Sequence, residues 1–182
     1  MEALRQDKRY TYEDYMNWPE DERWEILDGV AYMMATPNVA HQRISREILV
    51  QLAAFLKGKP CEVFAAPFTV RLSDDNVVEP DIVVVCDKSK LEGGKGCDGA
   101  PDMIVEILSP STAGMDKLKK FNKYLQAGVR EYWIVDPDGK VVNIHLLDSG
   151  RYTITAHGEA ETVPVSVLDG CVINLSDVFA ET

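Results

Sequence analysis

Two acidic residues stand inside strongly apolar segments of this chain, and their positions predict a site that does chemistry. Asp81 lies within residues 77–86 and Glu106 within residues 102–108, where β-branched and apolar residues are too continuous for a strand with one wet face. An ionised carboxylate is costly to bury unless it is paired or bound to a cation, so we expect Asp81 and Glu106 to meet at a polar opening in a sheet. Two carboxylates facing one point suit Mg²⁺ or Mn²⁺. The strand pattern alone is equally compatible with two acids that lie in solvent at strand ends.

A lysine on the following predicted helix would complete a hydrolytic site. Asp116, Lys120 and Tyr124 are spaced by four residues, which places them on one helical face. That face continues from the strand carrying Glu106, so we expect Lys120 to project back toward the carboxylates. A metal ion would polarise a phosphate and lower the pKa of its bound water, while the ammonium would stabilise developing charge. The alternative is an ordinary solvated ion pair between Asp116 and Lys120.

Length and composition predict one soluble domain that covers residues 1–182. The chain has 182 residues, of which 46% are hydrophobic and 27% charged, and these values are typical of a globular protein with a substantial core. No apolar run approaches the roughly 20 residues that span a bilayer, and the first residues have no apolar signal-peptide core. We therefore expect a cytoplasmic protein with no membrane partner.

The net charge limits the kinds of nucleic-acid binding that are plausible. A formal net charge of -11 argues against a generic, charge-driven binder, because Lys and Arg supply most non-specific affinity for phosphates. A bound divalent metal and a local basic helix would offset this charge at a single site.

The four cysteines are widely separated and form no C-x-x-C pair, so they predict neither a zinc site nor a small disulfide scaffold. Cys86 and Cys171 are expected to be buried thiols.

The order of predicted elements indicates a mixed sheet with helices packed against it. Thr11 is expected to cap a short helix, and Asp28 and Gly29 form the strongest short-range hairpin signal, between strands 24–27 and 30–34. The other expected elements, in chain order, are a helix over 39–57, two or three strands between 61 and 86, the strand carrying Glu106, a helix over 115–127 closed by Gly128, a hairpin of strands 131–135 and 141–147, one or two further short strands, and an amphipathic terminal segment around Leu175, Val178 and Phe179.

Taken together, these motifs resemble the Uma2 family, also called DUF820, a group of restriction-endonuclease-like proteins in the PD-(D/E)XK nuclease superfamily. The resemblance covers most of the chain, and residues 128–137 are particularly characteristic. Its other motifs are residues 11–13, 25–29, Pro37 with His41, 79–81, 105–112, and Asp116 with Lys120 and Tyr124. The resemblance implies an α/β, three-layer restriction-endonuclease-like fold, in which helices flank a central mixed β-sheet and β-hairpins lie toward both termini.

The resemblance also implies roles for the acidic residues and the lysine. Asp81 and Glu106 would correspond to the family's acidic metal centre, which would hold Mg²⁺ or Mn²⁺. The superfamily's usual lysine, two residues after the second acid, is Leu108 here, so the strand does not supply it. In the family the lysine is moved to the following helix, which matches Lys120; Lys117 and Lys119 point elsewhere by helical spacing.

Other candidate residues have a functional and a simpler interpretation. Glu25 matches the family's early glutamate and would complete the metal shell, or it is a surface acid near the hairpin turn. His41 would orient water or contact phosphate, or it is simply a helix-start residue. Ser109 and Ser111 would hydrogen-bond a ligand or cap the next helix.

The leading hypothesis is a Mg²⁺- or Mn²⁺-dependent phosphodiesterase of endonuclease type that acts on nucleic acid, with DNA favoured. Asp81, Glu106 and Glu25 would be metal ligands, Lys120 the charge stabiliser, and His41 a further catalytic candidate. The alternative is a non-catalytic interaction or regulatory protein that keeps the nuclease fold, which the charge and the missing strand lysine favour. Hydrolysis of another phosphate ester is a third hypothesis. An exposed strand edge would also allow a homodimer.

Overall fold

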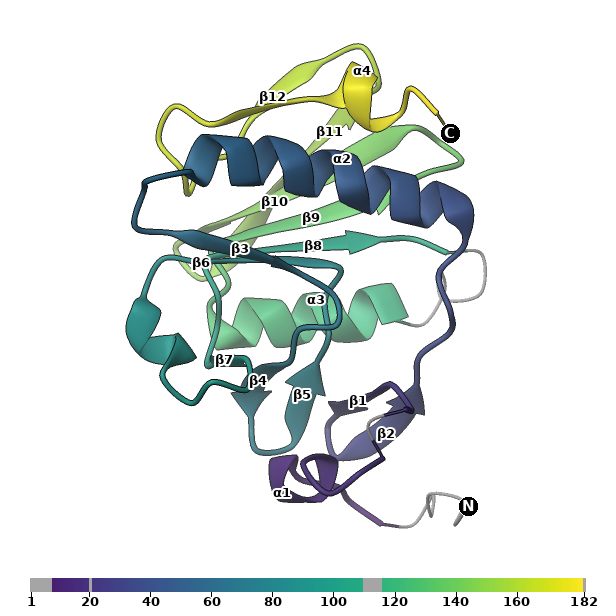
Figure 1. Ribbon diagram of the computed structural model, residues 1–182, viewed down its shortest axis with the longest axis vertical. Coiled ribbons are helices and arrows are strands. Elements are labelled where there is room, and N and C mark those ends of the chain that lie inside the picture. The colour runs from purple at the N-terminus through teal and green to yellow at the C-terminus, as the bar shows by residue number, and fades with distance from the viewer. Residues whose placement is uncertain (1–7, 20, 110–115, 182) are drawn as a thin grey trace.

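A computed structural model describes residues 8–19, 21–109 and 116–181 (Figure 1). The predictions for Ser111 and its neighbours at 110–115 lie outside these residues, and the side chains of Asp116 and Lys117 are likewise not described. The elements are α1 Tyr12–Tyr15, β1 Trp24–Leu27, β2 Val30–Met33, α2 Val39–Leu56, β3 Glu62–Ala65, β4 Val70–Ser73, β5 Asn76–Val78, β6 Ile82–Val85, the 3-10 helix η1 Lys88–Leu91, β7 Cys97–Asp98, β8 Met103–Ile107, α3 Asp116–Ala127, β9 Glu131–Asp136, β10 Val141–Asp148, β11 Arg151–Gly158, β12 Thr162–Pro164, β13 Val172–Asn174 and α4 Leu175–Val178.

A six-stranded mixed sheet forms the centre of the molecule, in the order β11-β10-β9-β8-β6-β3. Strands β8 and β9 run parallel, and the other neighbouring pairs in this sheet run antiparallel. Helix α2 covers one face and α3 the other (Figure 1). A five-stranded sheet, β2-β1-β5-β4-β7, and the β12-β13 hairpin complete the fold. The predicted α/β architecture of a mixed sheet flanked by helices, with hairpins toward both termini, is confirmed.

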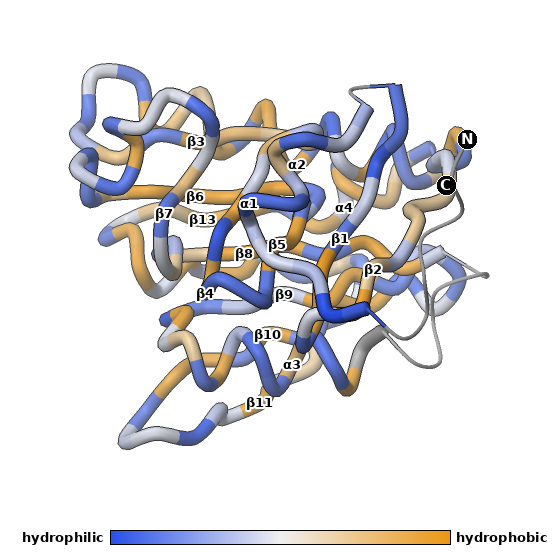
Figure 2. Tube along the Cα trace, turned by 90° about the horizontal axis from the view of Figure 1, so that it is seen from below, coloured by the Kyte–Doolittle hydropathy of each residue, from blue (hydrophilic) through white to orange (hydrophobic). Residues whose placement is uncertain are grey.

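The central strands are apolar on both sides because both of their faces are covered. Val84 and Val105 pack in the cluster that contains Ile48 of α2, whereas Val83 and Ile104 pack with Tyr124 of α3. Figure 2 accordingly shows β6 in continuous hydrophobic colouring. Strand side chains alternate between the two faces, so Glu106 shares the α3 side with Ile104.

The apolar segment 77–86 divides at residues 79–81 into β5 and β6, which belong to different sheets. Pro80 has no N–H to donate to a ladder, and the N–H of Glu79 donates instead to Glu25 Oε1 at 2.9 Å. Four strands therefore form between residues 61 and 86, whereas two or three were predicted. The division leaves Asp81 directly before β6, where its carbonyl still accepts a hydrogen bond of 3.0 Å from the Ala66 N–H.

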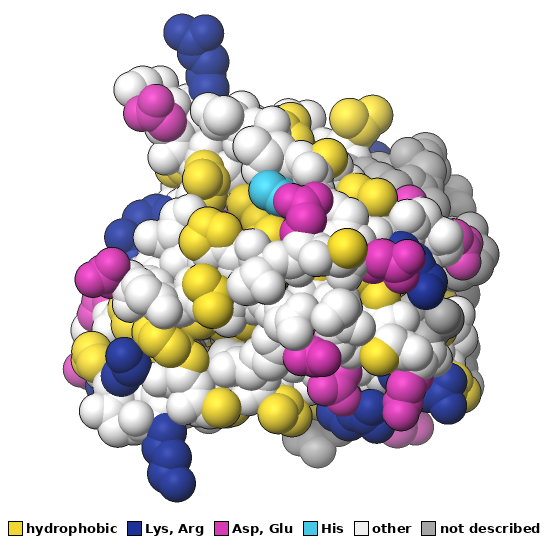
Figure 3. Space-filling model, turned by 90° about the horizontal axis from the view of Figure 1, so that it is seen from above, with side chains coloured by type: hydrophobic (Ala, Val, Ile, Leu, Met, Phe, Trp, Pro, Cys, Tyr) yellow, Lys and Arg dark blue, Asp and Glu magenta, His cyan; other side chains and the backbone are white. Residues whose placement is uncertain are grey.

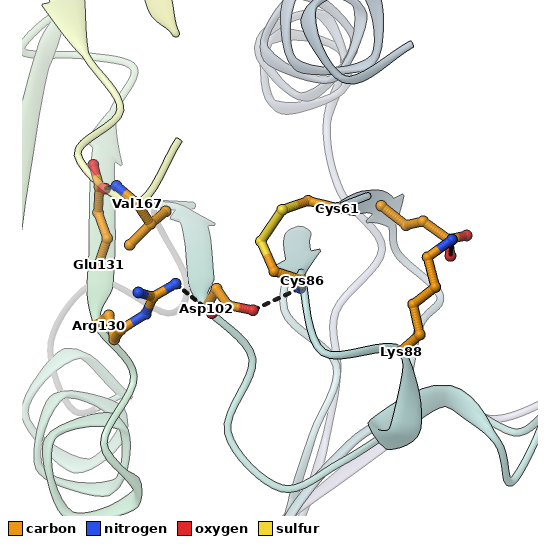
Figure 4. The surroundings of a disulfide bond; sticks show 8 residues. Cys61, Cys86, Lys88, Asp102, Arg130, Glu131 and Val167 are labelled. Atoms are coloured by element: carbon orange, nitrogen blue, oxygen red, sulfur yellow. Dashed lines mark hydrogen bonds and ion pairs between the residues drawn. A yellow bond between two sulfur atoms is a disulfide. The ribbon is translucent and has the colours of Figure 1, made fainter. Parts of the chain in front are cut away.

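The prediction of a free thiol at Cys86 is wrong, because Cys86 forms a disulfide with Cys61 (Figure 4). Glu62 pairs with Val85 in the β3-β6 ladder, which brings the adjacent cysteines together at the ladder's end. No local spacing signals this pair, since it depends on a strand pairing that joins residues 25 apart. Cys171 is a buried free thiol as predicted, and Cys97 is another.

Reduction of this disulfide is expected to lower the free energy of unfolding by about 3.5 kcal/mol, the chain-entropy value for a closed loop of this length. Urea denaturation with and without reductant measures the change. The Cys61→Ser/Cys86→Ser variant is the control, and its stability should not respond to reductant. Titration of the unreduced, denatured protein should find thiols only at Cys97 and Cys171; four reactive thiols would contradict the pairing.

No described helix combines the length and apolarity that crossing a membrane requires.

Candidate active site

All five predicted site residues line one pocket of about 110 Å³: Glu25, His41, Asp81, Glu106 and Lys120. The pocket lies where β6 begins, β8 ends, and α2 and α3 have their first turns, beside strand β1. Figure 1 shows the start of α2 and the end of β8 on the same side of the molecule. The structure thus brings these side chains together from four elements and from the residue directly before β6.

Lys120 lies buried between two carboxylates. Its Nζ is 2.7 Å from Glu25 Oε1 and 3.1 Å from Glu106 Oε1. The Lys120 side chain is 9% exposed, so the interpretation of this lysine as a solvated surface residue is wrong. Glu25 is also buried, which excludes its interpretation as a surface acid. The Lys120 ammonium therefore neutralises acids that would be costly to bury alone.

Glu106 lies buried in a pocket that holds more acidic than basic charge, and both features act on its pKa. Burial raises the pKa of Glu106 to about 7, with Asp81 and Glu25 adding to the shift and Lys120 opposing it. Burial disfavours the Lys120 ammonium, but Glu106 and Glu25 outweigh that effect and hold its pKa above the ordinary value. The Tyr124 hydroxyl donates to Glu106 Oε1 at 2.6 Å. Lys120 and Tyr124, four residues apart on α3, thus fix one oxygen of Glu106 between them.

Asp81 is fixed by one contact at each carboxylate oxygen. The backbone N–H of Ile107 donates to its Oδ2 at 2.7 Å, a contact that the adjacent pairing of Ile82 with Val105 makes possible. Its Oδ1 lies 3.1 Å from Nε2 of His41. His41 is itself placed by the N-cap of α2, because its backbone N–H donates to Asn38 Oδ1 at 2.9 Å. His41 therefore contacts an acid of the pocket, beyond its place at a helix start.

Sequence reasoning missed a second ionic group beside the pocket. Glu79 is 7% exposed, and its two oxygens accept hydrogen bonds of 2.8 Å each from Arg23 Nε and the Tyr15 hydroxyl. Arg23 also lines the pocket. One local signal existed, since Arg23 stands two residues before Glu25 and the period of a strand places both on one face. The partner Glu79 depends on the pairing of β1 with β5, through Ile26 and Val77, which no local pattern predicts.

The donors in the pocket suit a hard divalent cation, although the described residues contain no preformed cluster of three or more His, Cys, Asp or Glu side chains that would hold a metal. Asp81 and Glu106 line the pocket together. Mg²⁺ is commonly held by one or two carboxylates, with water and substrate phosphate as its other ligands. Burial chiefly raises the pKa of Glu106 and the neighbouring carboxylates add to it, so a bound cation would offset both effects. Glu25 Oε1 is engaged by Lys120 and the Glu79 N–H, so its metal role stays a prediction.

A sequence model of the Uma2 family, described as "Putative restriction endonuclease", matches residues 12–176. Two similar proteins come from Synechocystis sp. (strain ATCC 27184 / PCC 6803 / Kazusa). The first, named "Uncharacterized protein slr1290", is 28% identical over 147 residues, which cover 78% of this chain and 77% of that protein. The second, "Uncharacterized protein sll1609", is 25% identical over 134 residues, which cover 71% and 76%.

A crystal structure described as a putative nuclease belonging to DUF820, from Anabaena variabilis ATCC 29413, has a similar fold. It superposes with a TM-score of 0.78, over 93% of this chain and 97% of that one, at 22% sequence identity. At this identity the likeness establishes the fold alone.

Proposed function

The chain belongs to the Uma2 family, and from this membership we propose that it is a divalent-metal-dependent endonuclease that hydrolyses phosphodiester bonds in nucleic acid. The observation that carries the proposal is the meeting of Glu25, Asp81, Glu106 and Lys120 in one pocket. Carboxylates for a metal and a cation for the phosphate are the groups that metal-assisted phosphodiester hydrolysis needs.

Each residue of the pocket has a proposed task. Asp81 and Glu106 would hold Mg²⁺ or Mn²⁺, which when bound would polarise the phosphate and lower the pKa of the attacking water. Lys120 stabilises negative charge on the phosphate, and Glu25 keeps its ammonium buried and protonated. His41 orients Asp81 through the contact at 3.1 Å. Glu25 would join the metal shell only if substrate or metal drew Lys120 away from it.

We infer DNA as the substrate because the family model carries the description "Putative restriction endonuclease". The net charge of -11 opposes binding through a general electrostatic surface. On the face drawn in Figure 3, Lys and Arg side chains lie apart or beside Asp and Glu and form no continuous basic surface. Recognition would therefore depend on contacts at the pocket itself, including the metal.

Two further inferences concern the protein's surroundings. We propose a cytoplasmic location. Stable disulfides are uncommon in the cytoplasm, so a Cys61-Cys86 bond that is oxidised in cells would count against this location. We also propose a homodimer that forms by pairing of an exposed strand edge. Strand β11, at one edge of the six-stranded sheet, offers eight residues for it.

A non-catalytic interaction protein is the second candidate, and one observation favours it. The Lys120 ammonium already satisfies two carboxylates, so the cluster is stable as a purely structural ion-pair network. A partner that binds equally well after both Asp81 and Glu106 are substituted, together with a lack of nuclease activity, would support this candidate.

Titration calorimetry of Mn²⁺ tests the metal centre. We expect the wild type to bind Mn²⁺ and Asp81→Ala to bind it at least about tenfold more weakly, because one of two anionic ligands is lost. The control is Asp148→Ala, which removes an exposed acid outside the pocket and should bind like the wild type. Circular dichroism checks that each variant is folded.

Cleavage of DNA in Mg²⁺ or Mn²⁺ tests the function itself. The proposal would be wrong if Asp81→Ala and Lys120→Ala both left metal-dependent cleavage unchanged. Absence of both metal binding and cleavage in the wild type would favour the non-catalytic candidate.

A further inference from the structure

Arg23 lines the pocket, but its ion pair is with Glu79 rather than with one of the acids that line the pocket. It directly precedes β1, and its carbonyl accepts a hydrogen bond from the Met34 N–H, so its backbone is fixed by the β1-β2 hairpin. Its side chain is 32% exposed, while the Lys120 side chain is 9% exposed. Arg23 is therefore the more accessible of these two cations that line the pocket.

A buried carboxylate holds the guanidinium in one orientation. Arg23 Nε donates to Glu79 Oε2 at 2.8 Å, and the Tyr15 hydroxyl holds the other oxygen of Glu79 at the same distance. Tyr15 also contacts the Thr69 hydroxyl at 3.1 Å, which anchors the Glu79 side of the arrangement to the loop before β4. An arginine whose Nε is fixed in this way presents its remaining planar N–H donors in a defined direction.

One of these donors is unmet. Arg23 Nη2 is enclosed and has no hydrogen-bond partner among the described residues. Buried donors in folded proteins are nearly always paired, and one that is not is often explained by a ligand or an ion. Because Arg23 lines the pocket, a ligand that enters the pocket could supply the acceptor for Nη2.

We propose that Arg23 is a substrate-binding residue whose Nη2 donates to a non-bridging oxygen of the phosphodiester, a role that rests on the proposed function. Glu25 and Glu106 offset the charge of Lys120 Nζ, so a second cation would strengthen the attraction of the pocket for an anion. Three carboxylates in the pocket would repel a phosphate, and an arginine matches phosphate geometry better than a lysine does. Arg23 thus anchors the anion, while Glu79 acts as a positioning residue for Arg23.

Steady-state hydrolysis of DNA and of bis(4-nitrophenyl) phosphate in Mn²⁺ tests this role, with Arg23→Lys and Arg23→Gln compared with the wild type. We expect kcat/KM to fall by about 10- to 100-fold in both, since lysine keeps the charge but not the planar donor. The Mn²⁺ affinity should change by less than about threefold, because a guanidinium has no lone pair with which to bind a metal. Glu79→Gln should raise KM more than it lowers kcat, which a merely structural role would not do.

The matched control is Arg46→Lys with Arg46→Gln, an exposed arginine of α2 that pairs with Glu47 and Glu181 outside the pocket, and it should leave kcat/KM unchanged. Unchanged kcat/KM in Arg23→Lys would overturn the proposal. A loss of stability and of Mn²⁺ affinity as large as the loss of kcat/KM in the Arg23 variants would also overturn it.

A binding measurement separates this inference from the proposed function. If the wild type cleaves neither substrate, the hydrolytic function fails, and titration of inorganic phosphate in the presence of Mg²⁺ still tests Arg23. Weaker phosphate binding by Arg23→Lys, by about tenfold or more, would support an anion site at Arg23 without hydrolysis. Equal binding by both proteins, or none by the wild type, would overturn it.

Discussion

Substitution of Lys120 by methionine is expected to lower the free energy of unfolding by about 3–5 kcal/mol near neutral to mildly alkaline pH and to abolish phosphodiester hydrolysis. Methionine fills a similar volume but leaves Glu25 and Glu106 without the ammonium that lies 2.7 and 3.1 Å from them. Two carboxylates buried side by side without a counter-ion repel each other and lose hydration. Urea denaturation measures the stability, and DNA cleavage in Mn²⁺ measures the activity.

The neighbouring lysine on α3 provides a matched control. Lys119 Nζ contacts the Tyr32 hydroxyl at 2.7 Å in a partly exposed position, so Lys119→Met should cost about 1 kcal/mol or less. Adding Glu106→Gln to Lys120→Met should restore part of the lost stability but none of the activity, because it removes one unpaired charge and one metal ligand together. A Lys120→Met protein as stable and active as the wild type would contradict both assignments.

The sequence predicted the acids and the lysine because each left a local trace. Asp81 and Glu106 interrupt apolar segments that are covered on both faces, and an acid in such a place is conspicuous. Lys120 was found through its four-residue spacing from Tyr124, and both do contact Glu106. Spacing alone did not decide between a surface ion pair and a buried one, since burial depends on what covers the helix.

The features that the sequence did not predict depend on pairing between distant strands. The Cys61-Cys86 disulfide requires β3 to lie against β6, and the Arg23-Glu79 pair requires β1 to lie against β5. The division of segment 77–86 had a local trace in Pro80, but the strong β propensity of the valines on both sides favoured one strand. Local pattern thus located the chemical groups, while tertiary pairing determined which group holds which.

The ion pairs of the pocket would be present both in an endonuclease and in a non-catalytic interaction protein, so they do not by themselves separate these two candidates. The three carboxylates of the pocket outnumber its two cations, Arg23 and Lys120, so the pocket is more stable with a bound cation or a retained proton. An endonuclease would use the cation for hydrolysis, whereas an interaction protein would need only the proton. The effect of a divalent cation on the titration of Glu106 therefore distinguishes the two candidates.

In metal-free buffer the free energy of unfolding is expected to fall as pH rises through the pKa of Glu106, which burial raises to about 7. Below the ordinary glutamate pKa the carboxyl is protonated in both the folded and the unfolded chain, and its favourable contribution is fully present. Above the ordinary glutamate pKa, Glu106 is ionised in the unfolded chain but still protonated in the folded one. The free energy of unfolding therefore falls until the pH exceeds the pKa of Glu106 in the folded protein, by about 3 kcal/mol in all. Urea denaturation across this pH range measures the loss.

The difference in the free energy of unfolding between the wild type and Glu106→Gln isolates the titration of Glu106 from that of other groups. Burial also raises the pKa of Glu131, but that residue is common to both proteins and its contribution cancels. The free energy of unfolding of Glu106→Gln, relative to that of the wild type, should therefore rise by about 3 kcal/mol between mildly acidic and mildly alkaline pH. Mn²⁺ should restore the stability of the wild type at the alkaline end and have little effect on the variant, because only the wild type offers Asp81 and Glu106 together. A difference that stays constant with pH would show that Glu106 carries no raised pKa, and equal stabilisation of both proteins by Mn²⁺ would place the metal elsewhere.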